Sequence, residues 1–264
     1  MKKILVALSL VLALCIPISA FAESPLSLQN LSNEDVSKLS TKGIENIKKQ
    51  INSMSNKEFD NFIVDYLRNN SDHDKATINL SKLGVTLEKP SQAIKTRSVD
   101  AWEAELWVTS ARRGGESFHR LIAYYGFDQA SETKPASYDV IGVYWNKNAA
   151  SYYSYNNSDS TKNSLRSGQR TGEGLALFNA YDDKMLITMD YWVSVYVTPK
   201  TNGGDIDFGA DWTHTYDQKS TTSTGQASIS FGGTGLIEGS IGYSVTTSTT
   251  ETSWTLSDTN AIEL

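Results

Sequence analysis

The sequence predicts a mainly β protein, an antiparallel β-sandwich of about 8–10 strands that follows a small N-terminal region of 3–4 short α-helices. Three observations predict it. Short stretches of alternating apolar and polar residues fill the chain after residue 98, and turn-forming residues separate most of them. Two stretches before that point repeat one helix-start pattern. All six tryptophans follow residue 100, and Tyr66 alone of the thirteen tyrosines precedes it.

The first 22 residues have the pattern of a signal peptide. Two lysines open the chain, Ile4–Ile16 is almost entirely apolar, and Ala20-Phe21-Ala22 is a small-x-small cleavage pattern. We expect cleavage after Ala22 and secretion of the mature chain. The alternative is a lipid anchor at Cys15, but a large residue precedes that cysteine and it lies inside the apolar run.

Composition excludes several classes of site. Cys15 is the only cysteine, so a chain cleaved after Ala22 has no disulfide, cysteine nucleophile or thiolate metal site. The formal net charge of −6 argues against nucleic acid as a partner, because such binding depends on many Lys and Arg contacts to phosphate. No later run of eighteen apolar residues indicates a transmembrane helix. We expect no cofactor and no bound metal.

Residues 23–97 form the predicted helical region. Leu31–Val36 and Met54–Phe59 repeat one helix-start pattern, in which a serine caps the helix and an acidic residue follows three positions later. The last helix is expected to end at Gly84, and Pro90 prevents its continuation. Two interpretations stay open: a helical cover packed on the main domain, or a propeptide removed by cleavage near Lys95–Arg97.

Residues 98–264 form the predicted β-sandwich domain. One strand, Asp205–Tyr216, puts four apolar residues on one face and acidic residues on the other, which is typical of a sheet with one solvated face. In the strand around Val193–Val197 the valines alternate with Trp192, Ser194 and Tyr196, and we expect both faces of this strand to be covered. The predicted strands are Ala101–Ala111, Phe118–Phe127, Tyr138–Trp145, Ala150–Tyr155, Leu175–Tyr181, Leu186–Thr198, Asp205–Tyr216, Ala227–Phe231, Leu236–Thr249 and Ser253–Ser257.

Two acidic groups are candidate sites. Asp205, Asp207, Asp211 and His214 resemble a calcium site in spacing, but the ligand pattern is incomplete and a solvated strand face is the favoured interpretation. Glu103 and Glu105 would lie on one strand face beside Trp107, and paired carboxylates can hydrolyse glycosides. A secreted carbohydrate-active hydrolase is therefore one alternative function, although solvated positions again explain the pair.

A tyrosine-rich strand end is the candidate ligand-binding site. Tyr152, Tyr153, Tyr155 and Asn156 combine rigid aromatic surface with amide hydrogen bonding, and Trp107 is a further aromatic candidate on an open face. Such a surface suits a glycan, a cell-wall polymer or a protein. Alternating burial predicts Tyr153 and Tyr155 on one face and Tyr152 on the other.

The C-terminal stretch Ala227–Thr247 predicts a β-hairpin with Gly232–Gly235 at its tip. Its apolar residues alternate with serine, threonine and Glu238, and Ser/Thr tracts flank it. An ordinary sandwich hairpin explains this pattern, and a pore-forming hairpin that enters a membrane is the alternative. The candidate membrane-facing residues are Ile229, Phe231, Ile237, Ile241, Tyr243 and Val245.

The sequence thus favours a secreted, non-enzymatic β-sandwich protein that recognises a carbohydrate, cell-wall or protein partner through its surface. The two alternatives are a toxin that inserts the Ala227–Thr247 hairpin into a membrane and the hydrolase. A membrane partner is expected only for the toxin.

Overall fold

The computed structural model is mainly β with helices at its N-terminal side, which confirms the predicted fold class. It describes residues 28–91, 94–96, 104–127, 139–167, 169–181, 190–201, 204–217, 228–247 and 251–264. The predicted signal peptide lies outside the described residues.

Four α-helices open the described chain: α1 (Asn33–Lys38), α2 (Thr41–Ser53), α3 (Asn56–Asn69) and α4 (His73–Lys82). A short 3₁₀ turn, Leu28–Asn30, precedes them. Ser32 and Ser55 form the two predicted capping boxes at the starts of α1 and α3. Gly84 has φ = 79°, the left-handed conformation expected of a glycine after a helix. We call residues 28–82 the cap.

Two antiparallel sheets form the sandwich, and each of the ten predicted strands has a counterpart in the structure. Sheet A has the order β1-β3-β4-β9-β6, with β2 also paired to β3, and sheet B has the order β13-β10-β5-β8-β7. The short strands β1, β2 and β7 were not predicted. The bounds in sheet A are β1 Val85–Glu88, β2 Ile94–Thr96, β3 Ala104–Arg113, β4 His119–Phe127, β6 Ala150–Asn157 and β9 Asp190–Pro199. Those in sheet B are β5 Asp139–Trp145, β7 Asn163–Leu165, β8 Leu175–Ala180, β10 Ile206–Asp217 and β13 Glu251–Ile262.

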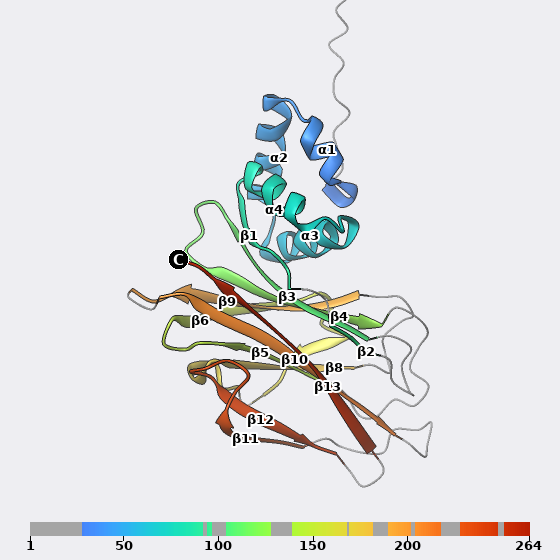
Figure 1. Ribbon diagram of the computed structural model, residues 1–264, viewed down its shortest axis with the longest axis vertical. Coiled ribbons are helices and arrows are strands. Elements are labelled where there is room, and N and C mark those ends of the chain that lie inside the picture. Colours follow the sequence, from blue (N-terminus) through green and yellow to red (C-terminus); the bar gives the residue numbers. More distant parts are fainter. Residues whose placement is uncertain are drawn as a thin grey trace, which may run out of the picture.

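The molecule has four layers, in the order cap, sheet A, sheet B and hairpin (Figure 1). The central core lies between the two sheets and includes Phe208 and Trp212, as the alternation in β10 predicts. A second apolar cluster joins the cap to the outer face of sheet A. A third joins sheet B to a separate two-stranded sheet, β11 (Ser228–Thr234) with β12 (Ile241–Thr246). Both outer faces of the sandwich are therefore covered, by different elements.

Helix α3 fastens the cap to sheet A through buried polar contacts. The guanidinium of Arg120 pairs with Asp60 at 2.8 Å, and both side chains are fully buried. The hydroxyl of Tyr196 donates to the same carboxylate at 2.6 Å, and the indole of Trp192 donates to Asn61 at 3.0 Å. Burial raises the pKa of Asp60 to about 7, although the neighbouring guanidinium opposes this. Apolar packing and these buried polar contacts thus hold the cap in this structure.

The cap changes the environment predicted for Trp107. The sequence placed this residue on an open face beside Glu105, but its side chain is only 5% exposed beneath the cap. Its ring stacks on Tyr124 with centroids 4.7 Å apart. Period-two alternation separates the two faces of a strand, but it does not show that another part of the chain covers the polar face.

Candidate functional site

The hairpin lies against sheet B through its apolar face. All six residues predicted to face a membrane take part in this contact: Ile237 is buried, and Ile229, Phe231, Ile241, Tyr243 and Val245 are partly buried. Their partners are Val140 and Tyr144 of β5 and Leu175 and Leu177 of β8. The apolar face of the hairpin and the outer face of sheet B therefore shield each other from water.

The opposite face of the hairpin is polar and exposed. Ser228 and Ser230 of β11 point outward, as do Ser244 and Thr246 of β12. Ser230 and Ser244 are directly opposite each other, with hydroxyl oxygens 2.8 Å apart. The hairpin is thus amphipathic in the way the sequence predicts.

The turn differs from the prediction. Gly232 and Gly233 belong to β11, which continues to Thr234, and the connection to β12 spans Gly235–Ser240. The register shifts between Phe231 and Thr234. The carbonyl of Ile237 accepts hydrogen bonds from the backbone and side chain of Ser240, and this compact turn directs Ile237 onto sheet B. A run of glycines marks a break in side-chain packing, but here that break is an irregularity within the strand.

The hairpin is part of an insert between two neighbouring strands. β10 and β13 are each 12 residues long and pair along their whole length, up to Asp217 opposite Glu251. Strand β10 ends at Asp217 and β13 begins at Glu251, and these two residues are paired with each other. Residues 218–250 therefore connect two neighbouring positions of sheet B. We call residues 218–250 the insert.

Asp211 is the polar centre of the contact between hairpin and sheet. It lies on β10, and its carboxylate accepts a hydrogen bond from the Tyr144 hydroxyl at 2.9 Å and a second from the Tyr243 hydroxyl of β12. The two tyrosine rings stack with centroids 6.0 Å apart. Burial raises the pKa of Asp211 to about 6, against the opposing effect of both hydroxyls. This carboxylate is therefore hydrogen-bonded beneath the hairpin and costly to ionise there.

Sequence reasoning placed Asp211 on a solvated face and missed this role. A signal for it exists at Gly142, which is opposite Asp211 in β5. A Cβ atom at Gly142 would lie 2.6 Å from the Asp211 carboxylate and 2.7 Å from the Tyr243 ring. A glycine within a strand can mark close approach by another group, and here Tyr243 fills that space.

The candidate ligand-binding tyrosines lie on two sides of β6. A register shift between Tyr152 and Ser154 puts Tyr152 and Tyr155 opposite Val197 and Val195, on the core side. Tyr152 packs on the core, Tyr155 is 40% exposed, and Tyr153 is 60% exposed on the outer side. The alternation predicted for these residues is therefore wrong, because an irregularity interrupts it.

Tyr153 has an aromatic partner that sequence reasoning missed. Its ring stacks on Phe118 with centroids 5.1 Å apart, and Phe118 stacks on Tyr196 at 5.2 Å. The amide of Asn156 donates to the Tyr196 hydroxyl at 3.3 Å. Trp107 is buried in the cap-side cluster and contributes no exposed surface to this group.

The acidic residues of β10 do not form one cluster with His214. His214 lies on the core side of the strand, where its ring is 2.9 Å from the carboxylate of Asp139. Asp211 faces the hairpin on the opposite side. Within the described ranges, no group of three or more His, Cys, Asp or Glu side chains is placed to hold a metal ion. Glu103 lies outside the described residues, and with it the proposed Glu103–Glu105 pair.

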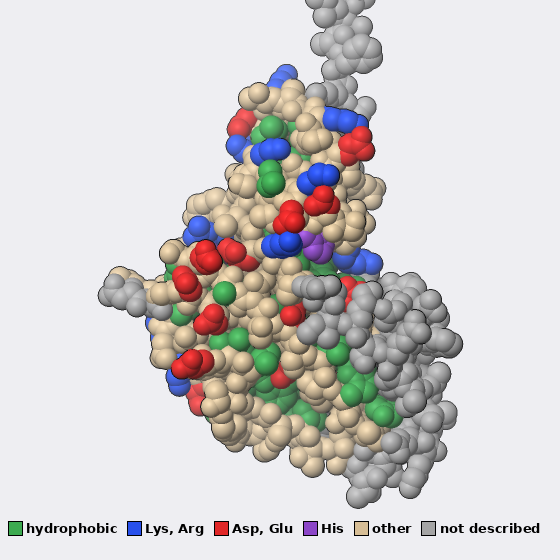
Figure 2. All heavy atoms as spheres, viewed as in Figure 1, with side chains coloured by type: hydrophobic (Ala, Val, Ile, Leu, Met, Phe, Trp, Pro, Cys, Tyr) green, Lys and Arg blue, Asp and Glu red, His purple; other side chains and the backbone are tan. Residues whose placement is uncertain are grey.

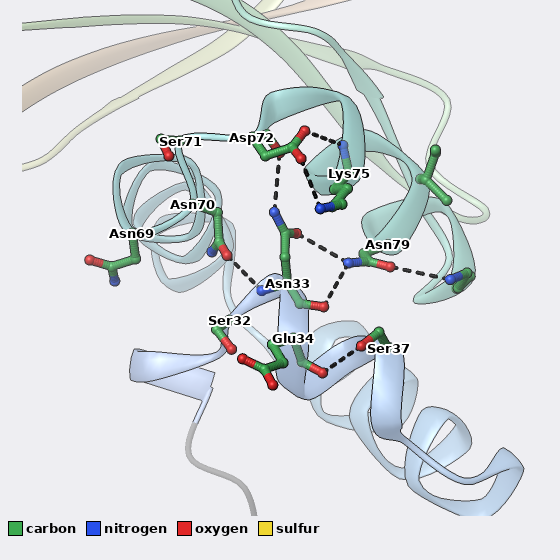
Figure 3. Close-up of a pocket in the computed structure, with 12 residues that line it drawn as sticks. Ser32, Asn33, Glu34, Ser37, Asn69, Asn70, Ser71, Asp72, Lys75 and Asn79 are labelled. Carbon is green, nitrogen blue, oxygen red and sulfur yellow. Dashed lines mark hydrogen bonds and ion pairs between the residues drawn. The ribbon is translucent and has the colours of Figure 1, made fainter.

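A polar pocket of about 670 Å³ lies in the cap between α1, α3 and α4 (Figure 3). Asn33 is at its centre: its backbone N–H donates to Asn70 at 2.6 Å, and its side-chain oxygen accepts from Tyr66 at 2.8 Å and from Asn79 at 3.1 Å. These polar groups bond one another across the three helices. The polar residues that line the pocket therefore have a structural role, because their hydrogen bonds connect the helices of the cap.

Charged side chains gather over the cap and the adjacent edge of the sandwich, whereas few of them lie on the described surface in view at the end where β11 and β12 lie (Figure 2). Among the helices that the structure describes, none has the length and apolar character needed to cross a membrane.

The sequence matches no protein family and no curated protein. Two solved structures show a distant likeness at 10% identity, and each covers 68% of this chain. One is described as a pore forming protein, with a TM-score of 0.33 and 92% of its own chain covered. The other is the NetB toxin of Clostridium perfringens in its membrane-inserted form, with a TM-score of 0.30 and 96% covered.

Proposed function

We propose that the protein is a secreted pore-forming protein whose insert leaves sheet B and enters a membrane as a β-hairpin. One observation carries the proposal. The insert contains the amphipathic hairpin β11–β12, it is flanked by the paired residues Asp217 and Glu251, and the hairpin packs on the sandwich through its apolar face. It can therefore separate from sheet B without breaking a strand pair of either main sheet.

The register supports a longer hairpin that continues β10 and β13. The β10–β13 ladder pairs odd positions with odd positions, and so does the β11–β12 ladder up to Phe231 opposite Tyr243. A continued ladder would therefore keep Ile229, Phe231, Tyr243 and Val245 on one face. Half of the insert, about 16 residues, would extend roughly 50 Å at 3.4 Å per residue. That exceeds the ~30 Å hydrocarbon core of a bilayer.

The charge of the insert is compatible with this proposal. Lys219 and Glu238 are its only charged residues in the sequence, and a continued β10–β13 register would pair Glu238 with Ser230, on the polar face opposite that of Ile229 and Phe231. The remaining polar residues are mainly serine, threonine and glycine. These can line an aqueous pore while the apolar face contacts lipid.

A disulfide across the hairpin tests the proposal. Continuing the β10–β13 register would pair Ser230 and Ser244 with other residues, so joining them as Ser230→Cys/Ser244→Cys locks the present register. Their close hydroxyls suit a disulfide, and Cys15 is replaced by serine. We expect dye release from liposomes only after reduction of this variant, both for the intact chain and for chain cleaved near Arg97. Equal release with and without reductant would contradict the proposal, as would no release by the wild-type protein in either form.

A second candidate function is recognition of a carbohydrate at Tyr153. The observation that favours it is an exposed tyrosine ring supported by Phe118 and the Tyr196 ring behind it. A supported ring with one open face suits stacking on a sugar. We expect Tyr153→Ala to abolish retention on immobilised glycans or cell-wall material, while Tyr152→Phe, a core-side change, preserves it. Retention of the Tyr153 variant would exclude this surface.

A further inference from the structure

We infer that Asp211 positions the hairpin on sheet B and makes its release increase as the pH rises. This inference rests on the proposed release of the hairpin. The geometry that carries it is the hydrogen bond from Tyr243 of β12 to Asp211 of β10, which connects the polar centre of the hairpin to the sheet. Gly142 leaves the space in which the Tyr243 ring reaches this carboxylate.

The described groups that face Asp211 are neutral donors. The titratable ones are the hydroxyls of Tyr144 on β5 and Tyr243 on β12, and burial raises the pKa of both. The guanidinium of Arg170 contacts the hairpin elsewhere, over the ring of Phe231 and 4.5 Å from its centroid. Glu238 is exposed in the turn. Hydrogen bonds from neutral groups therefore offset only part of the cost of holding an ionised carboxylate beneath the hairpin.

The direction of the pH effect follows from the two environments of the carboxylate. Beneath the hairpin its pKa is about 6, compared with the ordinary 3.8 that it regains when release exposes it to water. The covered form thus holds the proton more strongly, and protonation favours the docked hairpin. Docking is strongest below about pH 4 and weakens as the pH rises through about 6. The ratio of released to docked hairpin should increase on the order of 50-fold between pH 4 and pH 7.

Thiol labelling in the absence of any membrane measures this ratio. Val245→Cys places a thiol on the covered face of β12, and Ser244→Cys places one on the exposed face, both with Cys15 replaced by serine. The intrinsic reactivity of a thiol changes with pH, so the labelling rate of the Val245→Cys variant is divided by that of the Ser244→Cys variant at each pH. This quotient should rise on the order of 50-fold from pH 4 to pH 7.

Two substitutions identify the group responsible. In the Asp211→Asn background the quotient should be independent of pH, because the amide keeps hydrogen-bonding capacity without titrating. In Tyr243→Phe the ring remains, but the carboxylate loses a donor, so the midpoint of the rise should move to higher pH. Circular dichroism confirms that each variant is folded.

A quotient independent of pH in the wild-type background would overturn the inference, as would a rise that persists unchanged in Asp211→Asn. Because labelling needs no membrane, this result is separate from the leakage result. A pH-dependent quotient without dye release would support control of docking by Asp211 while contradicting pore formation. Dye release with a quotient independent of pH would support pore formation while contradicting control of docking by Asp211.

Discussion

Replacing Gly174 by alanine should destabilise the fold strongly, because this residue has neither the conformation nor the space for a side chain. Its φ of +76° lies in the left-handed region, which costs a residue with a Cβ about 1–2 kcal/mol. The added Cβ would also lie 2.3 Å from the carbonyl oxygen of Trp145 and 3.2 Å from the Cβ of Ser240. Such overpacking typically costs about 1–3 kcal/mol more. We expect a total loss of roughly 2–5 kcal/mol.

Gly115 provides a matched control. Its φ is +86°, but no heavy atom lies within 4 Å of the position of an added Cβ. Gly115→Ala should therefore lose only the conformational component, about 1–2 kcal/mol. Urea unfolding followed by tryptophan fluorescence gives both free energies of unfolding. If the two variants differ by less than about 0.5 kcal/mol, the reasoning from the Trp145 contact is refuted.

Three further predictions concern the cap. Ser55→Ala removes the capping box of α3 and should lower the free energy of unfolding by about 1 kcal/mol in urea titration. The control Ser53→Ala, on the exposed end of α2, should change this free energy by less than about 0.5 kcal/mol. Equal losses in the two variants would contradict the stabilising role of the Ser55 capping box. Asp60 has a folded pKa of about 7, above its ordinary 3.8, so its contribution to stability is present below about pH 4 and is lost as the pH rises through 7. Asp60→Asn should flatten this part of the pH profile of unfolding, and an unchanged profile would oppose the assignment. Trp192→Phe removes the donor to Asn61 and should lower the free energy of unfolding by about 1–3 kcal/mol. An unchanged free energy of unfolding would contradict a stabilising role for this hydrogen bond.

The sequence predicted strands and helix starts well because both depend on local patterns. Alternation located every main strand, and the serine caps located α1 and α3. The short strands β1, β2 and β7 escaped prediction because three or four residues carry too little alternation. Their strand character depends on pairing with β3 or β8, which is a property of the folded chain.

The candidate site was predictable only in part, for the same physical reason. Its apolar hairpin residues follow from alternation, and all of them contact sheet B. The role of Asp211 depends on Tyr243, which lies on the hairpin packed against sheet B, and the environment of Trp107 depends on the cap. Both are contacts between layers, and a local pattern reveals which residues share a face but not what covers that face. The irregularity at Tyr153 likewise has no clear pattern in its neighbours.

The paired position of Asp217 and Glu251 also affects the order of folding. Zipping β10 to β13 closes a loop of about 30 residues, and the entropy of loop closure grows only slowly with length, by about 0.6 kcal/mol for each doubling. Sheet B can therefore form while the insert is still an open loop, and the hairpin can dock afterwards onto a completed surface. The length of the insert is consequently free to vary at little cost to the folding of the sandwich.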